Sequence, residues 1–159
     1  MSGPELHPDV APLGFLLGSW IGEGAGHYPT IEDFAYGEEI RVSHVGKPFL
    51  AYTQRTWSLD DGRPLHAESG FWRLAGRTRV ELVIAHPTGV VEVEEGELSG
   101  TSIALATIAM AKTGSAKDVE RLTRDLRVRH DELAYDLKMA AVGQPLQPHL
   151  AARLTRTGA

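Results

Sequence analysis

Histidine is the residue type with the greatest capacity for chemistry in this sequence, which contains seven histidines and no cysteine. A neutral imidazole is a common ligand of metal ions. His149 is best placed for this role, because Pro148 fixes the backbone directly before it. Ala151 and Ala152, which follow it, have small side chains. A rigid backbone with little bulk nearby suits the binding of a planar ligand at the imidazole of His149.

The other histidines are weaker candidates. His66 and His86 fall in or beside expected strands, and with His149 they would supply the three imidazoles of a catalytic zinc site. The sequence has no closely spaced histidine pair to support such a site, and a structural role in packing is the simpler interpretation. His27 and His130 fall at expected turns and fit a solvated surface.

Acidic and basic side chains give no strong catalytic motif. Lys117 lies at the mouth of an expected strand, where it is either solvated or paired with a carboxylate of a ligand. The run 22–26 lacks the G-x-G-x-x-G spacing of a nucleotide-binding fingerprint, and no G-x-S-x-G motif occurs. Four glutamates are interpreted as the hydrated face of a strand: Glu92, Glu94, Glu95 and Glu97.

The elements that must position these residues are mostly β-strands, because apolar residues recur with a period of two. Turn residues separate the segments. About ten short strands predict an antiparallel sandwich or barrel. An up-and-down barrel of roughly eight to ten strands can enclose one small ligand. The expected segments are 18–31, 38–45, 49–59, 65–73, 80–84, 90–98, 102–109, 118–129, 132–141 and 149–157.

Two segments depart from the simple strand pattern. Residues 10–17 predict a short helix that plugs or caps the barrel. Residues 104–114 have helical propensity, since Ala and Met are good helix formers. The β-branched residues Ile103, Thr107 and Ile108 and the flanking turns favour a strand there instead.

The glycine run near the N-terminus is the most distinctive local pattern. Gly22, Gly24 and Gly26 lie on one face of a strand, which they leave without side chains. Interior glycines weaken a strand, so we infer that a large group or another backbone approaches closely there. Trp20, on the same segment, is expected to pack in the wall or base of the barrel.

Composition bounds the class of protein. The chain of 159 residues has the length of one domain, and its net charge of −5 provides no basic face for nucleic acid. No apolar run is long enough to span a bilayer, so no membrane partner is expected. The N-terminal segment lacks the pattern of a signal peptide, and a cytoplasmic location is the expectation. Without cysteine, a c-type haem attachment is excluded.

Several distinctive motifs follow one another along the chain. They are GSWIGEG, the corner Tyr28-Pro29-Thr30-Ile31, Glu38-Glu39, SHVGKPFLAYTQRTW, HAESGFWR, AHPTGVVEVEEG, Ala116-Lys117 and MAAVGQPLQPHL. With these motifs in this order, the chain resembles the nitrobindin family. The resemblance runs from about residue 13 to residue 156 and implies an all-β fold, a ten-stranded antiparallel up-and-down barrel similar to lipocalins and fatty-acid-binding proteins. With it we expect a single barrel domain over 13–157 and an N-terminal tail over 1–12.

The resemblance also implies site residues and a cofactor. The cofactor is ferric haem b, held non-covalently, with His149 as the axial ligand of its iron. Thr30 matches a haem-contacting position, and Lys117 matches a further contact at a haem propionate. His86 stands where some relatives carry glutamine. We expect this second imidazole to change ligand access or hydration on the side of the haem opposite His149. The expected cavity-lining residues are Leu65, His66, His86 and Met139.

The implied activity is the isomerisation of peroxynitrite to nitrate, with nitric oxide binding as a companion property. A non-catalytic carrier or sensor of nitric oxide, haem or another small apolar ligand is the alternative. A structural or regulatory domain is a third interpretation, without a second module in this sequence to support it. An exposed strand edge would allow a homodimer, although strand alternation alone does not reveal one.

Overall fold

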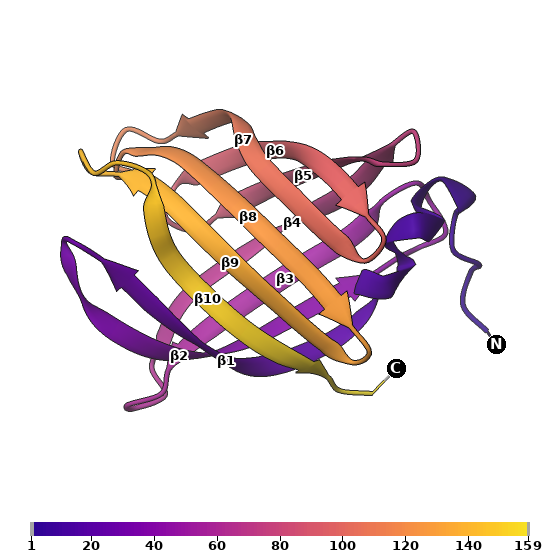
Figure 1. Ribbon diagram of the computed structural model, residues 1–159, viewed down its shortest axis with the longest axis horizontal. Coiled ribbons are helices and arrows are strands. Elements are labelled where there is room, and N and C mark those ends of the chain that lie inside the picture. Colours follow the sequence, from indigo (N-terminus) through magenta and orange to yellow (C-terminus); the bar gives the residue numbers. More distant parts are fainter. Residues whose placement is uncertain (1, 159) are drawn as a thin grey trace.

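Ten antiparallel strands form a closed barrel in the computed structural model, which describes residues 2–158 (Figure 1). Each strand pairs with its neighbours in sequence, and β1 pairs with β10 to close the sheet. The predicted up-and-down barrel is therefore confirmed, including a strand rather than a helix over the alanine-rich segment. The strands are β1 (Gly18–Tyr28), β2 (Ile31–Ser43), β3 (Leu50–Ser58), β4 (Pro64–Ala75), β5 (Arg79–His86), β6 (Val90–Ser99), β7 (Ser102–Lys112), β8 (Val119–Arg129), β9 (Glu132–Ala141) and β10 (Gln147–Arg156).

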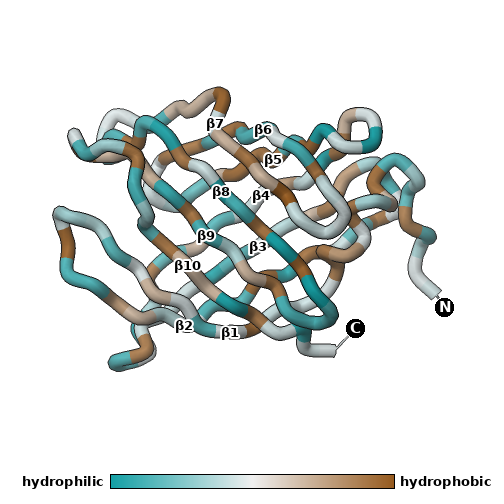
Figure 2. The backbone as a smooth tube through the Cα atoms, in the orientation of Figure 1, coloured by the Kyte–Doolittle hydropathy of each residue, from teal (hydrophilic) through white to brown (hydrophobic). Residues whose placement is uncertain are grey.

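The strands form because their side chains alternate between the barrel interior and solvent. In β9, Leu133, Tyr135 and Leu137 are buried, whereas Asp136 and Lys138 are exposed. The same alternation of apolar and polar residues follows the strands in Figure 2. It fixes the register, since a slip by one residue would turn every apolar side chain outward.

The end of the barrel on the right in Figure 1 is closed by a 3₁₀ helix, η1 (Pro8–Leu16). Val10, Leu13 and Leu16 of this helix are buried in the core. The indole Nε1 of Trp20 donates a hydrogen bond to the carbonyl of Leu16 over 2.9 Å. The expected helical cap is therefore present. It begins at Pro8 and buries Val10, so part of the range 1–12, which we expected to be a tail, is packed against the barrel.

The opposite end of the barrel carries the turns that join β1 to β2, β3 to β4, β5 to β6, β7 to β8 and β9 to β10 (Figure 1). Residues Ser102–Ala106 of β7 pair with Thr123–Arg127 of β8, and the strands then diverge. The outer part of β7, up to Lys112, continues to pair with β6. This end is therefore less tightly closed than the end that η1 covers, and we call it the open end of the barrel. In the described part of the chain, no helix has the length and apolar character needed to cross a membrane.

The bare glycine face of β1 is filled by aromatic rings and by neighbouring backbone. A Cβ atom on Gly24 would lie 2.4 Å from the Tyr36 ring, and one on Gly26 would lie 2.1 Å from the Phe34 ring. At Gly22 the nearest atom would be the carbonyl oxygen of Arg153 on β10, at 2.0 Å. Two rings from β2 and the β10 backbone thus explain the glycines, and a ligand is not needed to account for them.

We predict that Gly22→Ala destabilises the barrel by about 2 kcal/mol or more, because the new methyl group overlaps backbone that cannot rotate away. The matched control is Gly114→Ala, since a Cβ at Gly114 would meet no atom within 4 Å. Urea denaturation of the two variants and the wild-type protein measures the difference. Equal stability of the two variants would contradict this explanation of the glycine face.

Candidate functional site

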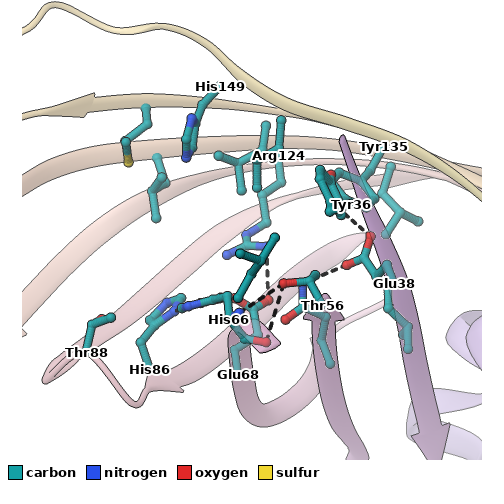
Figure 3. Close-up of a pocket in the computed structure, with 18 of the residues that line it drawn as sticks. Tyr36, Glu38, Thr56, His66, Glu68, His86, Thr88, Arg124, Tyr135 and His149 are labelled. Atoms are coloured by element: carbon teal, nitrogen blue, oxygen red, sulfur yellow. Dashed lines mark hydrogen bonds and ion pairs between the residues drawn. The ribbon is translucent and has the colours of Figure 1, made fainter. Parts of the chain in front are cut away.

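A cavity of about 780 Å³ occupies the barrel interior, a volume suited to a small-molecule or cofactor ligand. Figure 3 shows that polar side chains gather inside it, with His149 on one side and His66 and His86 on the other. Apolar side chains complete its wall, as expected for a ligand pocket. They include Leu65, Leu82, Leu105, Leu122, Leu137, Met139 and Leu150.

His149 is held at the cavity by an irregularity in β10. The pairing of β10 with β9 shifts register between Pro148 and Leu150, and a bulge of this kind redirects the side chain within it. The Nδ1 atom of His149 lies 2.9 Å from the backbone carbonyl oxygen of His27, to which its N–H donates. Nε2 then carries the free lone pair. The Tyr28 ring packs edge-on against the imidazole, with ring centroids 5.2 Å apart.

The protonation state of His149 also suits ligation. Burial lowers the pKa of His149 below its ordinary value of 6.5, because the charged imidazolium loses hydration. The neutral form therefore predominates at pH 7. A neutral, oriented imidazole with a free Nε2 can bind iron, zinc or another borderline metal ion.

The structure brings five of the seven predicted site residues to this one cavity. Leu65, His66, His86, Met139 and His149 all line it. Thr30, in the turn between β1 and β2, is exposed at the open end of the barrel. Lys117 is exposed in the connection between β7 and β8, at the same end. The roles assigned to these residues by resemblance stay predictions.

His66, His86 and His149, the combination for which the sequence offered no support as a zinc site, do not meet at one point in the structure. His66 and His86 are in direct contact, with Nε2 of His66 3.0 Å from Nδ1 of His86. The third potential metal ligand beside them is a carboxylate oxygen of Glu68, which lies on the inner face of β4 as His66 does. His149 projects from the opposite side of the cavity (Figure 3).

The sequence analysis missed a buried arginine at the centre of the barrel. Arg124 lies on the inward face of β8, between the positions of Leu122 and Leu126. Its Nε is 2.6 Å from a carboxylate oxygen of Glu94, and a terminal nitrogen is 2.8 Å from one of Glu92. Its other terminal nitrogen is 3.3 Å from Glu68. One guanidinium thus binds three carboxyl groups from β4 and β6.

The interpretation of the β6 glutamates as a hydrated face is wrong for two of them. Glu92 and Glu94 are buried, because they share a face with Val90 and Leu98. Glu95 and Glu97 lie on the other face, where they pair with Arg79. The buried glutamates occupy the same alternate positions of β6 as Val90 and Leu98, and the other two occupy the positions between. This alternation is visible in the sequence and could have identified the buried pair.

The interior carboxyl groups differ in pKa, because burial and the Arg124 guanidinium affect each of them to a different extent. Burial alone would raise the pKa of Glu68, but the Arg124 guanidinium and the nearby His66 and His86 imidazoles hold it well below its ordinary value. Burial raises the pKa of Glu94, and the Arg124 guanidinium only partly compensates. A single guanidinium therefore keeps Glu68 ionised, while Glu94 retains a proton more readily.

Glu38 on β2 belongs to a second buried network next to the first. One carboxyl oxygen accepts a hydrogen bond from the Tyr135 hydroxyl over 2.6 Å, and the other accepts one from Nε2 of Gln54 over 2.7 Å. The Tyr135 oxygen lies 2.7 Å from the Tyr36 oxygen. Burial raises the pKa of Glu38 from its ordinary value of 4.5 to about 7, despite these hydrogen bonds.

Comparison with known proteins places this geometry among related barrels. A family model described as "THAP4-like, heme-binding beta-barrel domain" matches residues 9–156. Peroxynitrite isomerase 1 of Mycolicibacterium paratuberculosis is 52% identical over 156 residues, covering 96% of this chain and 97% of the relative. Peroxynitrite isomerase 1 of Mycobacterium tuberculosis is 51% identical over 159 residues, with the same coverage.

Solved structures agree with the barrel architecture. The crystal structure of Rv2717c from M. tuberculosis superposes with a TM-score of 0.91 at 48% identity, covering 97% of this chain and all of that one. The S-type phycobiliprotein lyase CPES from Guillardia theta gives a TM-score of 0.67 at 11% identity, over 92% of this chain and 90% of the lyase chain. The second likeness concerns the fold alone.

The raised pKa of Glu38 predicts a specific dependence of stability on pH. Between pH 4.5 and pH 7 the folded protein keeps a proton at Glu38 that the unfolded chain has lost. The stability from this proton is complete below pH 4.5 and is lost as the pH rises through 7. For Glu38→Gln, we expect the free energy of unfolding to fall less between pH 5 and pH 8 than in the wild type, by about 3 kcal/mol.

Urea denaturation at several pH values measures this difference. The exposed Glu120→Gln on β8 is the matched control and should follow the wild-type profile. Parallel profiles for the wild-type protein and Glu38→Gln would show that Glu38 titrates at the same pH in the folded and unfolded chain.

Proposed function

The chain belongs to the family of THAP4-like, heme-binding β-barrel domains, and on this premise we propose that it isomerises peroxynitrite to nitrate. A ferric haem b, held non-covalently in the barrel, would supply the metal centre for this reaction, and nitric oxide would be a second ligand of the same group. The observation that carries the proposal is the His149 imidazole, which is neutral, oriented by the His27 carbonyl and open at Nε2 toward the cavity.

The metal-ligating imidazole of His149 and the lining of the cavity both suit haem. Leu65, Met139 and Leu150 are among the apolar side chains that line the cavity together with His149, and an apolar wall suits a porphyrin face. An uncharged imidazole with its other ring nitrogen hydrogen-bonded to a carbonyl is a common axial ligand of haem iron. The sequence contains no cysteine, so a thioether attachment is excluded and binding is non-covalent.

Each site residue has a role in this proposal. His149 would hold the iron through Nε2, while the His27 carbonyl keeps its ring in one orientation. Thr30 and Lys117 are both exposed at the end of the barrel opposite η1. In this proposal Thr30 would contact the haem, and Lys117 would pair with a propionate. His66 is half-buried and faces the cavity, so its imidazole lies where an anionic substrate would enter.

The haem supplies a ferric centre for the chemistry when it is bound, and the protein supplies binding, orientation and electrostatics. The interior carboxyl groups do not need to act as bases, since an isomerisation transfers no net proton. Arg124 offsets their charge, which would otherwise oppose entry of an anionic substrate. The substrate therefore meets a cavity lined by histidine and apolar side chains.

Stopped-flow measurement of peroxynitrite decay tests the function. We expect the ferric-haem-loaded protein to accelerate decay and to yield nitrate. His149→Ala should lower the rate at least tenfold, because it removes the axial ligand. His130→Ala, at an exposed turn between β8 and β9, is the matched control and should behave as the wild type.

Rates are compared at equal concentrations of bound haem, so that loss of haem is not mistaken for loss of chemistry. If the loaded wild-type protein accelerates decay no more than free ferric haem does, the isomerase proposal is wrong. Haem bound without turnover would then support the non-catalytic carrier or sensor.

A further inference from the structure

A cluster of three potential metal ligands lies in the cavity wall across from His149. Nε2 of His66 and Nδ1 of His86 are 3.0 Å apart. An oxygen of Glu68, Oε2, lies 3.6 Å from the first and 3.5 Å from the second. Donor atoms bonded tetrahedrally to one ion at about 2.1 Å lie about 3.4 Å from each other. The three atoms already have nearly the spacing that a shared metal ion requires.

We propose that His66, Glu68 and His86 form a second metal site, separate from the iron ligand His149, for a divalent transition metal such as Zn²⁺. Two imidazoles and one carboxylate are the protein ligands of known catalytic zinc sites, in which a fourth position stays open. The same set also binds non-haem Fe²⁺. The open position faces the cavity that His66 and His86 line.

The partners of these residues orient them for ligation. Nε2 of His86 lies 2.7 Å from a carboxylate oxygen of Glu92, to which its N–H donates. This bond leaves the lone pair of His86 on Nδ1, directed at the site. A carboxylate that fixes the tautomer of a ligating histidine is the usual outer-shell arrangement of metal sites.

Glu68 is oriented in the same way from its other oxygen. Oε1 accepts hydrogen bonds from the Tyr52 hydroxyl over 2.7 Å and from Arg124 over 3.3 Å. Oε2 is thereby turned toward the two imidazoles. The charge of the surroundings is also favourable, because three interior carboxyl groups face the single Arg124 guanidinium. A divalent cation offsets part of this excess.

The contact between the two imidazoles has a simpler alternative. At 3.0 Å it is a normal hydrogen bond in which Nε2–H of His66 donates to Nδ1 of His86. A bound ion takes the place of that proton with little movement of either ring. The experiment must therefore separate a hydrogen-bonded pair from a metal site.

Isothermal titration with Zn²⁺ of the protein without added haem tests the site directly. We expect one Zn²⁺ per chain, and at least a tenfold weaker affinity for His86→Gln, which removes one ligand while keeping a polar side chain of similar reach. His130→Gln is the matched control, since His130 lies at an exposed turn. His149→Ala should retain the zinc affinity of the wild type, because the site does not include it.

Co²⁺ provides a second readout, because its visible absorption reports the number and geometry of its ligands. A spectrum that is present in the wild type and in His149→Ala but lost in His86→Gln supports the site. Equal Zn²⁺ affinity in the wild type and His86→Gln overturns it and leaves a hydrogen-bonded pair. Far-ultraviolet circular dichroism and haem titration of His86→Gln show whether the barrel and the haem cavity are intact, so failure here is distinguishable from failure of the haem proposal.

Discussion

The buried guanidinium of Arg124 is the interaction on which the rest of the interior depends. It lies within the barrel and binds carboxyl groups of Glu68, Glu92 and Glu94 from two other strands. Removing one partner of a buried ion pair typically costs about 3–5 kcal/mol, because a charge is left without compensation. Without Arg124, three carboxyl groups would be buried against one another. Three carboxyl groups can lie together in the interior because this one guanidinium binds all of them.

The orientation of the cavity histidines follows from that network. Arg124 holds Glu92, which contacts His86, and it holds Glu68, which approaches both His66 and His86. His149 is oriented independently by a backbone carbonyl of β1. The cavity therefore has two imidazole centres on facing sides. One depends on buried charges and the other on the closure of the barrel between β1 and β10.

Local sequence patterns predicted the architecture well, because a period of two and turn residues determine antiparallel strands. The family resemblance, rather than local pattern, indicated that Leu65, His66, His86 and Met139 line one cavity, and the structure places all four there. The Arg124 network could not be predicted in this way. Its partners are 30 to 56 residues away along the chain, and only the closed barrel brings them together. The hydrogen bond between His149 and His27 spans 122 residues and was equally hidden.

The central claim is that the barrel binds ferric haem through His149, and an absorption titration with haem tests it most directly. For the wild-type protein, the account predicts a saturable Soret shift at one haem per chain. For His149→Ala it predicts a weaker and spectrally different complex, which added imidazole restores toward the wild-type spectrum. Identical titrations for the two proteins would contradict the assignment of His149 as the iron ligand.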